Sequence, residues 1–243
     1  MKAMPQKAPK IITTSIAIVF SLAFLYAFGR GHLIRSYLYM GIGNCQSIPI
    51  LCATAGEKFQ QPAINKDYLQ EMLPYKFGSL EISLPKGFKV IRGQIQKAYY
   101  KKLKYPSREG VVYLLYEKPG FFTGLFPQVK KQGITDNRAF LKHTMNADIR
   151  KVNNLSDAFF VVMKSIFIPD IGRQASALIT VFSLDDKAGF INYNLGKDMN
   201  YYDCNIVDKD DRYFKVYIKD PDRRVSLDEV FAVISTVNEA NKP

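Results

Sequence analysis

The sequence is poor in the residues from which most metal and nucleophilic sites are built. Its 243 residues include two histidines, three cysteines and no tryptophan. His32 and His143 stand far apart, and H-E-x-x-H, G-x-S-x-G, P-loop and cysteine–histidine zinc patterns are all absent. The chain therefore lacks the familiar sequence signatures of zinc enzymes, serine hydrolases and nucleotide-binding proteins. We therefore predict no catalytic residue, no metal site and no cofactor, while an enzyme that works through carboxylates stays open.

Acidic residues are also scarce relative to basic ones. The chain carries 34 lysines and arginines against 22 aspartates and glutamates, a net charge of +12. Five of the basic residues and none of the acidic ones precede residue 57, so the remainder holds 29 basic and 22 acidic residues, a net charge of +7. This surplus favours an anionic partner, such as membrane lipid or the acidic surface of another membrane protein. No nucleic-acid recognition motif is present, and we predict no nucleic-acid partner.

One stretch lacks charge altogether. Residues 11–29 read IITTSIAIVFSLAFLYAFG, with three lysines before them and two arginines shortly after. As an α-helix this run spans about 28 Å, close to the hydrocarbon thickness of a bilayer. We therefore predict a basic N-terminal tail (residues 1–10) and one transmembrane helix (residues 11–29).

A removable signal peptide is the alternative to a membrane anchor. It requires a small-residue cleavage site directly after the apolar run, whereas the nearest A-x-A pattern, Ala53–Ala55, lies more than twenty residues further on. A signal-anchor fits better. Because more basic residues precede the run than follow it, the positive-inside rule places the N-terminus in the cytoplasm. The prediction is a single-pass protein of the cell membrane with an extracytoplasmic C-terminal domain.

Residues 30–64 are predicted to be a juxtamembrane linker. Within it Cys45 and Cys52 enclose six residues that include Pro49, a spacing that suits a small disulfide loop in an oxidising compartment. Two unrelated buried thiols are the alternative. Residues 37–40 are either an interfacial aromatic belt or a continuation of the membrane helix.

Residues 65–243 are predicted to form a single α+β domain, in which helices cover a mainly antiparallel sheet as an α/β/α sandwich. The strands show alternating apolar and polar residues, and the last helix carries a capping box at Ser226 and Glu229. Expected helices cover 65–73, 136–149, 156–167 (with a strand as the alternative) and a C-terminal stretch from Ser226. Expected strands cover 80–84, 88–92, 97–105, 111–118, 177–184, 190–195, 200–207 and 212–219.

Three further residue patterns in this domain have structural explanations. Alternation along residues 212–219 predicts a sheet with one buried face. Cys204 shares the parity of its apolar neighbours and is expected to be a core thiol. The acidic runs 185–186 and 208–211 stand where hairpin turns are needed, and aspartate favours turns. We therefore interpret them as turn residues rather than as a calcium or catalytic site.

The pattern resembles the PsbP-like fold, a family named from an extrinsic subunit of the photosynthetic oxygen-evolving complex. The resemblance lies in LEISLPKGFKV (80–90), which opens the domain, and in FKVYIKD (214–220) leading into SLDEVFAVISTV (226–237). It implies a non-enzymatic, protein-binding accessory domain. It carries over no functional residue.

Two surface features are candidate contact sites. A basic and aromatic hairpin strand is either an edge strand protected by its lysines or a docking strip for anions; its residues are Lys97, Tyr99, Lys101, Lys102, Lys104 and Arg108. A glycine- and proline-bounded loop is either a lid on the core or a contact for membrane or partner. Its residues are Phe121, Phe122, Leu125 and Phe126, flanked by Lys118, Lys130 and Lys131.

The leading functional prediction is a membrane-tethered, non-catalytic binding module, an accessory or assembly subunit of a larger membrane protein complex. The alternative is a membrane-associated small-ligand carrier or hydrolase that uses a pocket on the sheet face. A carrier needs a concave apolar pocket with a few convergent polar groups. A scaffold needs an exposed patch instead.

Overall fold

The computed structural model describes residues 29–52, 59–77, 80–85, 89–91, 101–104, 111–168, 177–197, 199–221, 223 and 225–239. The predicted tail 1–10 and the predicted membrane helix, apart from Gly29, lie outside these residues. Among the helices in this part of the chain, none is long and apolar enough to cross a membrane.

The domain is α+β and is built on two sheets. The larger sheet has the strand order β1-β7-β8-β9-β10-β6-β5-β4, in which only the described pair β1–β7 is parallel. Its strands are β1 (Phe59–Gln60), β4 (Lys89–Ile91), β5 (Lys101–Lys104), β6 (Val111–Glu117), β7 (Leu178–Ser183), β8 (Lys187–Leu195), β9 (Asn200–Asp208) and β10 (Tyr213–Asp220). The smaller antiparallel sheet, ordered β11-β3-β2, contains β2 (Met72–Phe77), β3 (Leu80–Pro85) and β11 (Asn238–Glu239).

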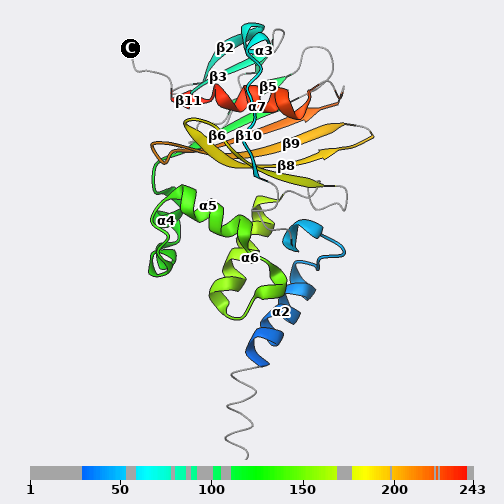
Figure 1. The fold of residues 1–243 in the computed structure, drawn as a ribbon, viewed down its shortest axis with the longest axis vertical. Helices are drawn as coiled ribbons and strands as arrows, with labels where there is room; N and C mark the ends of the chain where they lie inside the picture. Colours follow the sequence, from blue (N-terminus) through cyan, green and yellow to red (C-terminus); the bar gives the residue numbers. More distant parts are fainter. Residues whose placement is uncertain are drawn as a thin grey trace, which may run out of the picture.

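Helices lie on both sides of the larger sheet (Figure 1). On one side are α7 and the smaller sheet, with α3 at the end of the molecule. On the other side are α4, α5 and α6, and α2 lies beyond them beside α6. The bounds are α2 (Arg30–Gly41), α3 (Lys66–Gln70), α4 (Phe121–Leu125), α5 (Asn137–Asn146), α6 (Leu155–Phe167) and α7 (Leu227–Ser235), with 3-10 turns η2 (Pro49–Cys52), η4 (Pro127–Gln132) and η5 (Ile149–Lys151).

The helices begin where the sequence places their caps. The side chains of Asp136 and Asn154 accept hydrogen bonds from backbone N–H groups in the first turns of α5 and α6. Ser226 and Glu229 form the complete capping box of α7. The helix predicted from residue 156 is therefore confirmed, and the strand alternative for that stretch is wrong.

Both faces of the central strands are buried, although the alternation in residues 212–219 predicted one. Phe214 faces α7 and the smaller sheet, whereas Tyr213, on the opposite face, is buried against the helices α4 to α6. In β10 the predicted alternation holds from Phe214 onward, with Lys215, Tyr217 and Lys219 only half-buried, and Tyr213 departs from it because the helical layer covers this end of the strand. Cys204 lies fully buried in the core beneath α7, which confirms the core-thiol interpretation.

The structure also corrects the start of the domain. The predicted helix 65–73 ends at Gln70, and Pro74 lies within β2, opposite Ser83 of β3. Within the described residues β2 is an edge strand, where a residue without a backbone N–H is tolerated. Here proline marks an edge rather than the end of a helix.

The acidic run 208–211 forms the turn between β9 and β10, as expected. Asp208 accepts hydrogen bonds from the backbone N–H of Asp210 and Arg212 and pairs with the Arg212 guanidinium. Asp211 has a positive φ of 61°, and its carboxylate accepts backbone N–H bonds of 2.8 Å from both Gly120 and Asn137. The turn thus also fixes the start of α4 and of α5.

Candidate functional site

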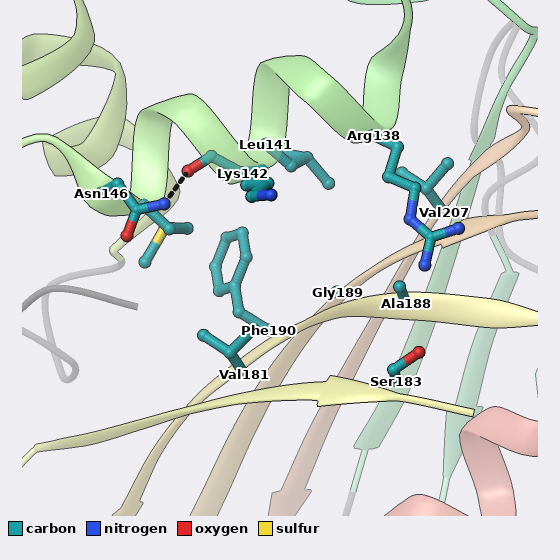
Figure 2. A pocket seen from close by; sticks show the side chains of 11 residues that line it. Arg138, Leu141, Lys142, Asn146, Val181, Ser183, Ala188, Gly189, Phe190 and Val207 are labelled. Atoms are coloured by element: carbon teal, nitrogen blue, oxygen red, sulfur yellow. Dashed lines mark hydrogen bonds between the residues drawn. The ribbon is translucent and has the colours of Figure 1, made fainter. Parts of the chain in front are cut away.

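A cavity of about 530 Å³ lies between α5 and the larger sheet. Figure 2 shows its two walls, with α5 above and strands β7 and β8 below. The volume falls within the roughly 300–1,000 Å³ of typical small-ligand sites. Among the pockets found over the described residues, this cavity best matches a carrier site on the sheet face.

The helix wall follows from the periodicity of α5. Leu141 and Met145, four residues apart, are buried and face the sheet, while Arg138 and Lys142 stand exposed at the rim. Neither cation was predicted as a site residue, although their spacing of four residues on the predicted helix 136–149 was a usable signal.

The strand wall is made mainly of apolar side chains. Phe190 points from β8 toward α5, with Val181 of β7 beside it (Figure 2). Gly189 lies where β8 and β9 approach closely, since a Cβ built there would be 1.9 Å from the carbonyl oxygen of Asn205. A side chain is therefore excluded at this position by the backbone of β9, and Gly189 lines the cavity with its backbone.

A row of polar side chains follows on the same face of the sheet, further along the strands. Asp203 is buried, accepts a 3.1 Å hydrogen bond from Asn205 Nδ2 and forms a 3.0 Å ion pair with Lys215. Burial raises the pKa of Asp203, and the nearby Lys215 only partly opposes this. Opposite it on β8, the buried amide of Asn192 has no hydrogen-bond partner within the described residues. An ordered water or a polar ligand atom would satisfy this amide.

The described part of the chain contains no set of side chains suited to bind a metal ion. No group of three histidine, cysteine, aspartate or glutamate side chains there could hold a metal ion. His32 and His143 are both exposed and lie on different helices, α2 and α5.

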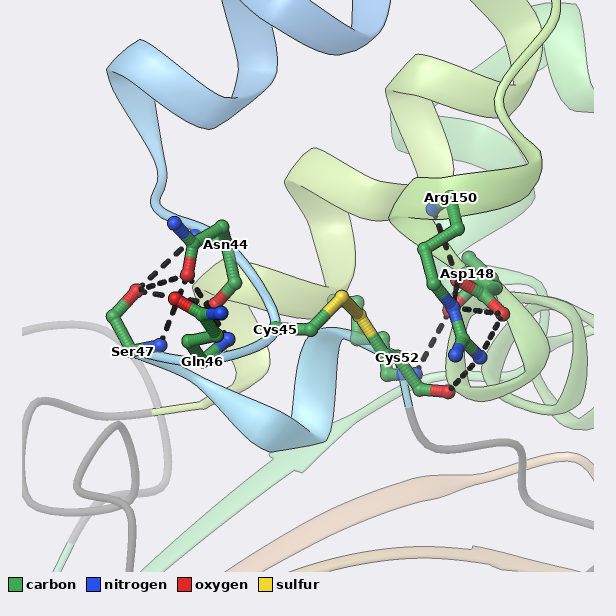
Figure 3. Close-up of a disulfide and its surroundings, with 9 residues drawn as sticks. Asn44, Cys45, Gln46, Ser47, Cys52, Asp148 and Arg150 are labelled. Atoms are coloured by element: carbon green, nitrogen blue, oxygen red, sulfur yellow. Dashed lines mark hydrogen bonds and ion pairs between the residues drawn. A yellow bond between two sulfur atoms is a disulfide. The ribbon is translucent and has the colours of Figure 1, made fainter.

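Cys45 and Cys52 form a disulfide with their Cα atoms 5.6 Å apart (Figure 3). The loop between them is shaped by Asn44, whose side-chain oxygen accepts hydrogen bonds from backbone N–H groups of residues 46 and 47. Arg150 is held by an ion pair with Asp148 and donates a 3.0 Å hydrogen bond to the carbonyl of Cys52. The disulfide therefore lies against the α5–α6 connection.

The segment predicted as a linker is folded where the structure describes it. Leu38 of α2 and Leu51 of η2 are buried in a small core with Val161 of α6. Arg35 adds hydrogen bonds to the carbonyls of Arg150 and Val152. The predicted boundary of the domain at residue 65 is thus too late, because residues 30–52 pack on the α6 layer.

The phenylalanine loop folds as α4 and η4, and the structure favours the lid over the contact surface. Phe122 is 4% exposed, stacks on Phe140 at 4.7 Å and donates its backbone N–H to Asn137. Phe121 and Phe126 are half-buried, and only Leu125 among the loop's predicted apolar contacts is exposed. Lys118, Lys130 and Lys131 are exposed.

The basic strip is only partly described. Lys97, Tyr99 and Arg108 lie outside the described residues. Lys101, Lys102 and Lys104 belong to β5, which pairs with β4 on one side and β6 on the other. Of the two interpretations of this strand, the edge strand is therefore wrong, and the docking strip stays a prediction.

The structure reveals an apolar surface that includes Tyr37 and Met40 from the predicted belt 37–40 and extends beyond it. Leu33, Tyr37 and Met40 form a stripe on α2, with 73%, 76% and 79% of their surface exposed. The neighbouring helix α6 exposes a second stripe, made of Leu155, Val162 and Ile166. Large exposed apolar side chains on helices in contact with each other are typical of a contact surface. We call these six residues the apolar end.

Comparison with protein-family models and with curated proteins finds no match to this chain.

Proposed function

We propose that this chain is a membrane-tethered binding module without catalytic activity, an accessory or assembly subunit of a larger membrane protein complex. The proposal includes a membrane helix over residues 11–29, an extracytoplasmic domain and a PsbP-like sandwich arrangement of that domain. The observation that carries it is the apolar end, which begins directly after the uncharged run.

The connection between the run and the domain is short and firmly held. Gly29 has helical backbone angles (φ −81°, ψ −22°), and no side chain caps α2. Nothing in this geometry stops a helix that enters from the preceding residues. The buried Leu38 and the hydrogen bonds of Arg35 to the carbonyls of Arg150 and Val152 fix α2 to the domain. An anchor that continues into α2 therefore holds the domain in one orientation at the membrane.

Helix dimensions indicate what covers the apolar end. With a rise of about 1.5 Å per residue, Leu33 lies about 6 Å beyond Gly29, within a headgroup layer that is about 5–8 Å thick. Met40 lies about 16 Å beyond Gly29 on the same estimate, outside that layer. Lipid can therefore cover Leu33, whereas Tyr37 and Met40 need a protein. Another membrane protein is the partner that reaches this height.

Site-specific photocrosslinking of the full chain in its native membrane tests this proposal. A photoreactive residue at position 33 is expected to give lipid adducts, and one at position 40 a discrete adduct with another membrane protein. The matched control is position 66 on α3, which lies at the opposite end of the molecule from α2 (Figure 1) and should give neither.

Two results would contradict the proposal. Lipid adducts alone at position 40 would show that the bilayer covers the whole apolar end. Adducts of the chain with a second copy of itself would show a homo-oligomer rather than a subunit of another complex.

A further inference from the structure

We propose that the cavity between α5 and the larger sheet binds a long-chain fatty carboxylate, with the chain inside the cavity and the carboxylate between Arg138 and Lys142. This site lies apart from the apolar end and does not depend on which protein covers that surface. It gives the domain a ligand in addition to its partner.

The interior of the cavity suits a hydrocarbon chain. Leu141 and Met145 of α5 and Phe190 of β8 are buried and apolar, and Val181 of β7 continues the wall toward the opening. An apolar lining with few polar groups is typical of sites that bury the body of a ligand and leave its head at the rim.

The rim supplies the charge. Arg138 and Lys142 are one helical turn apart, which allows a single carboxylate to contact both. Among the residues that the structure describes, no acidic residue lines the cavity and neither side chain is in an ion pair. Figure 2 shows Arg138 reaching from α5 toward Ala188 of β8, across the opening. The Asp211 carboxylate accepts the backbone N–H of Arg138 and not its guanidinium. Two cationic side chains without an ion pair in the described part of the chain, at the mouth of an apolar cavity, favour an anionic head on an apolar body.

The size of the cavity favours one chain. About 530 Å³ accommodates a single-chain amphiphile, whereas a phospholipid with two chains and a large headgroup is too big. A fatty carboxylate is the simplest anion of this shape, and the choice of this anion rests on the proposed membrane tether, which holds the domain close to the source of fatty carboxylates.

The test uses the full chain in phosphatidylcholine nanodiscs and a hexadecanoate probe with a diazirine at the chain end. After irradiation, mass spectrometry is expected to find saturable labelling of peptides from α5 and β8. Unlabelled hexadecanoate should compete for this labelling, and hexadecanol should not.

The variant R138Q/K142Q should reduce saturable labelling by about tenfold or more, because it removes both charge-assisted contacts. The charge-matched control K66Q/K76Q, with exposed lysines on α3 and β2, should label as the unmodified chain does.

A second variant tests the cavity without changing charge. Ala188→Trp fills the space beside Arg138 and should abolish labelling, while circular dichroism shows whether the fold is retained.

Equal competition by hexadecanol, or unchanged labelling in R138Q/K142Q, would overturn the carboxylate site. Competition by phosphatidic acid as strong as that by hexadecanoate would overturn the single-chain assignment. Labelling confined to α2 would show that the probe reports the membrane and not the cavity.

Discussion

Lys164 is a lysine buried within a helical layer. Its side chain is fully buried in α6, and its Nζ donates a 2.8 Å hydrogen bond to the carbonyl of Ala147. Burial lowers the pKa of Lys164 from 10.5 to about 8, and Asp148 only partly opposes this. Between pH 8 and 10.5 the unfolded chain therefore binds more protons at this residue than the folded chain. The contribution of Lys164 to stability rises with pH across that window.

Lys164→Met tests this linkage. Relative to the variant, the unmodified protein should gain up to about 3 kcal/mol in free energy of unfolding between pH 7 and 10.5, at about 1.4 kcal/mol per pKa unit. Chemical denaturation of the full chain in detergent at several pH values measures the difference. Lys66→Met, at an exposed lysine of α3, is the control and should show no such trend. A difference that stays constant with pH would mean that Lys164 keeps an ordinary pKa.

At the scale of elements, α4 shows why three phenylalanines stand close together in the sequence. Phe122 makes ring contacts with Phe140 and Tyr213, at 4.7 and 4.9 Å, while Leu125 in the same helix is 58% exposed. Phe122→Ala should lower the free energy of unfolding by about 3–5 kcal/mol, whereas Leu125→Ala should change it by no more than about 0.5 kcal/mol. Denaturant titration of both variants measures these values. Equally small losses of stability in both variants would contradict the lid and would favour a contact surface.

The α2–η2 unit offers a second prediction at this scale. The disulfide closes a loop with a sequence separation of 7, and closing a loop of this length stabilises by about 2.5 kcal/mol in the chain-entropy model. Replacing Cys45 and Cys52 with serine should therefore speed amide exchange in α2 and η2, while exchange in α7 stays unchanged.

Alkylation checks the redox state of the same cysteine pair. In protein isolated without reductant, Cys45 and Cys52 should resist alkylation even after denaturation, whereas the buried free thiol of Cys204 should react once the chain unfolds. If all three cysteines react under these conditions, the disulfide is absent from the native protein.

At the scale of the whole molecule, the predicted feature to test is the orientation of the tethered domain relative to the membrane. A reporter that is active only outside the cytoplasm, fused after Pro243, should be active, because more basic residues precede the uncharged run than follow it. Replacing Lys2, Lys7 and Lys10 with glutamine leaves the arginines after the run as the dominant charges. This variant should shift a substantial share of the fusion to the opposite orientation, and an inactive reporter on the unmodified chain would reverse the predicted topology.

Local chemistry determined much of this protein from the sequence alone. The capping box at Ser226, the aspartate turn at 208–211 and the burial of Cys204 depend on neighbours a few residues away or on simple alternation. Short stretches of sequence contain this information, and the structure has these three features as predicted. The charge-free run at residues 11–29 is equally a property of the sequence, and its predicted path through a membrane stays a prediction.

Tertiary structure alone decided the features that depend on distant partners. Pro74 lies in a strand because, in the described part of the chain, β2 pairs with β3 on one side and has a free edge on the other. Phe122 is buried because Phe140 of α5 and Tyr213 of β10 pack against its ring. The cavity combines the cations of α5 with an apolar wall from strands some forty to fifty residues further along the chain. Periodicity in the sequence shows which face of a helix or strand is apolar and which is charged. Only the packing of separate elements decides whether that face is covered, exposed to solvent or left open as the wall of a cavity.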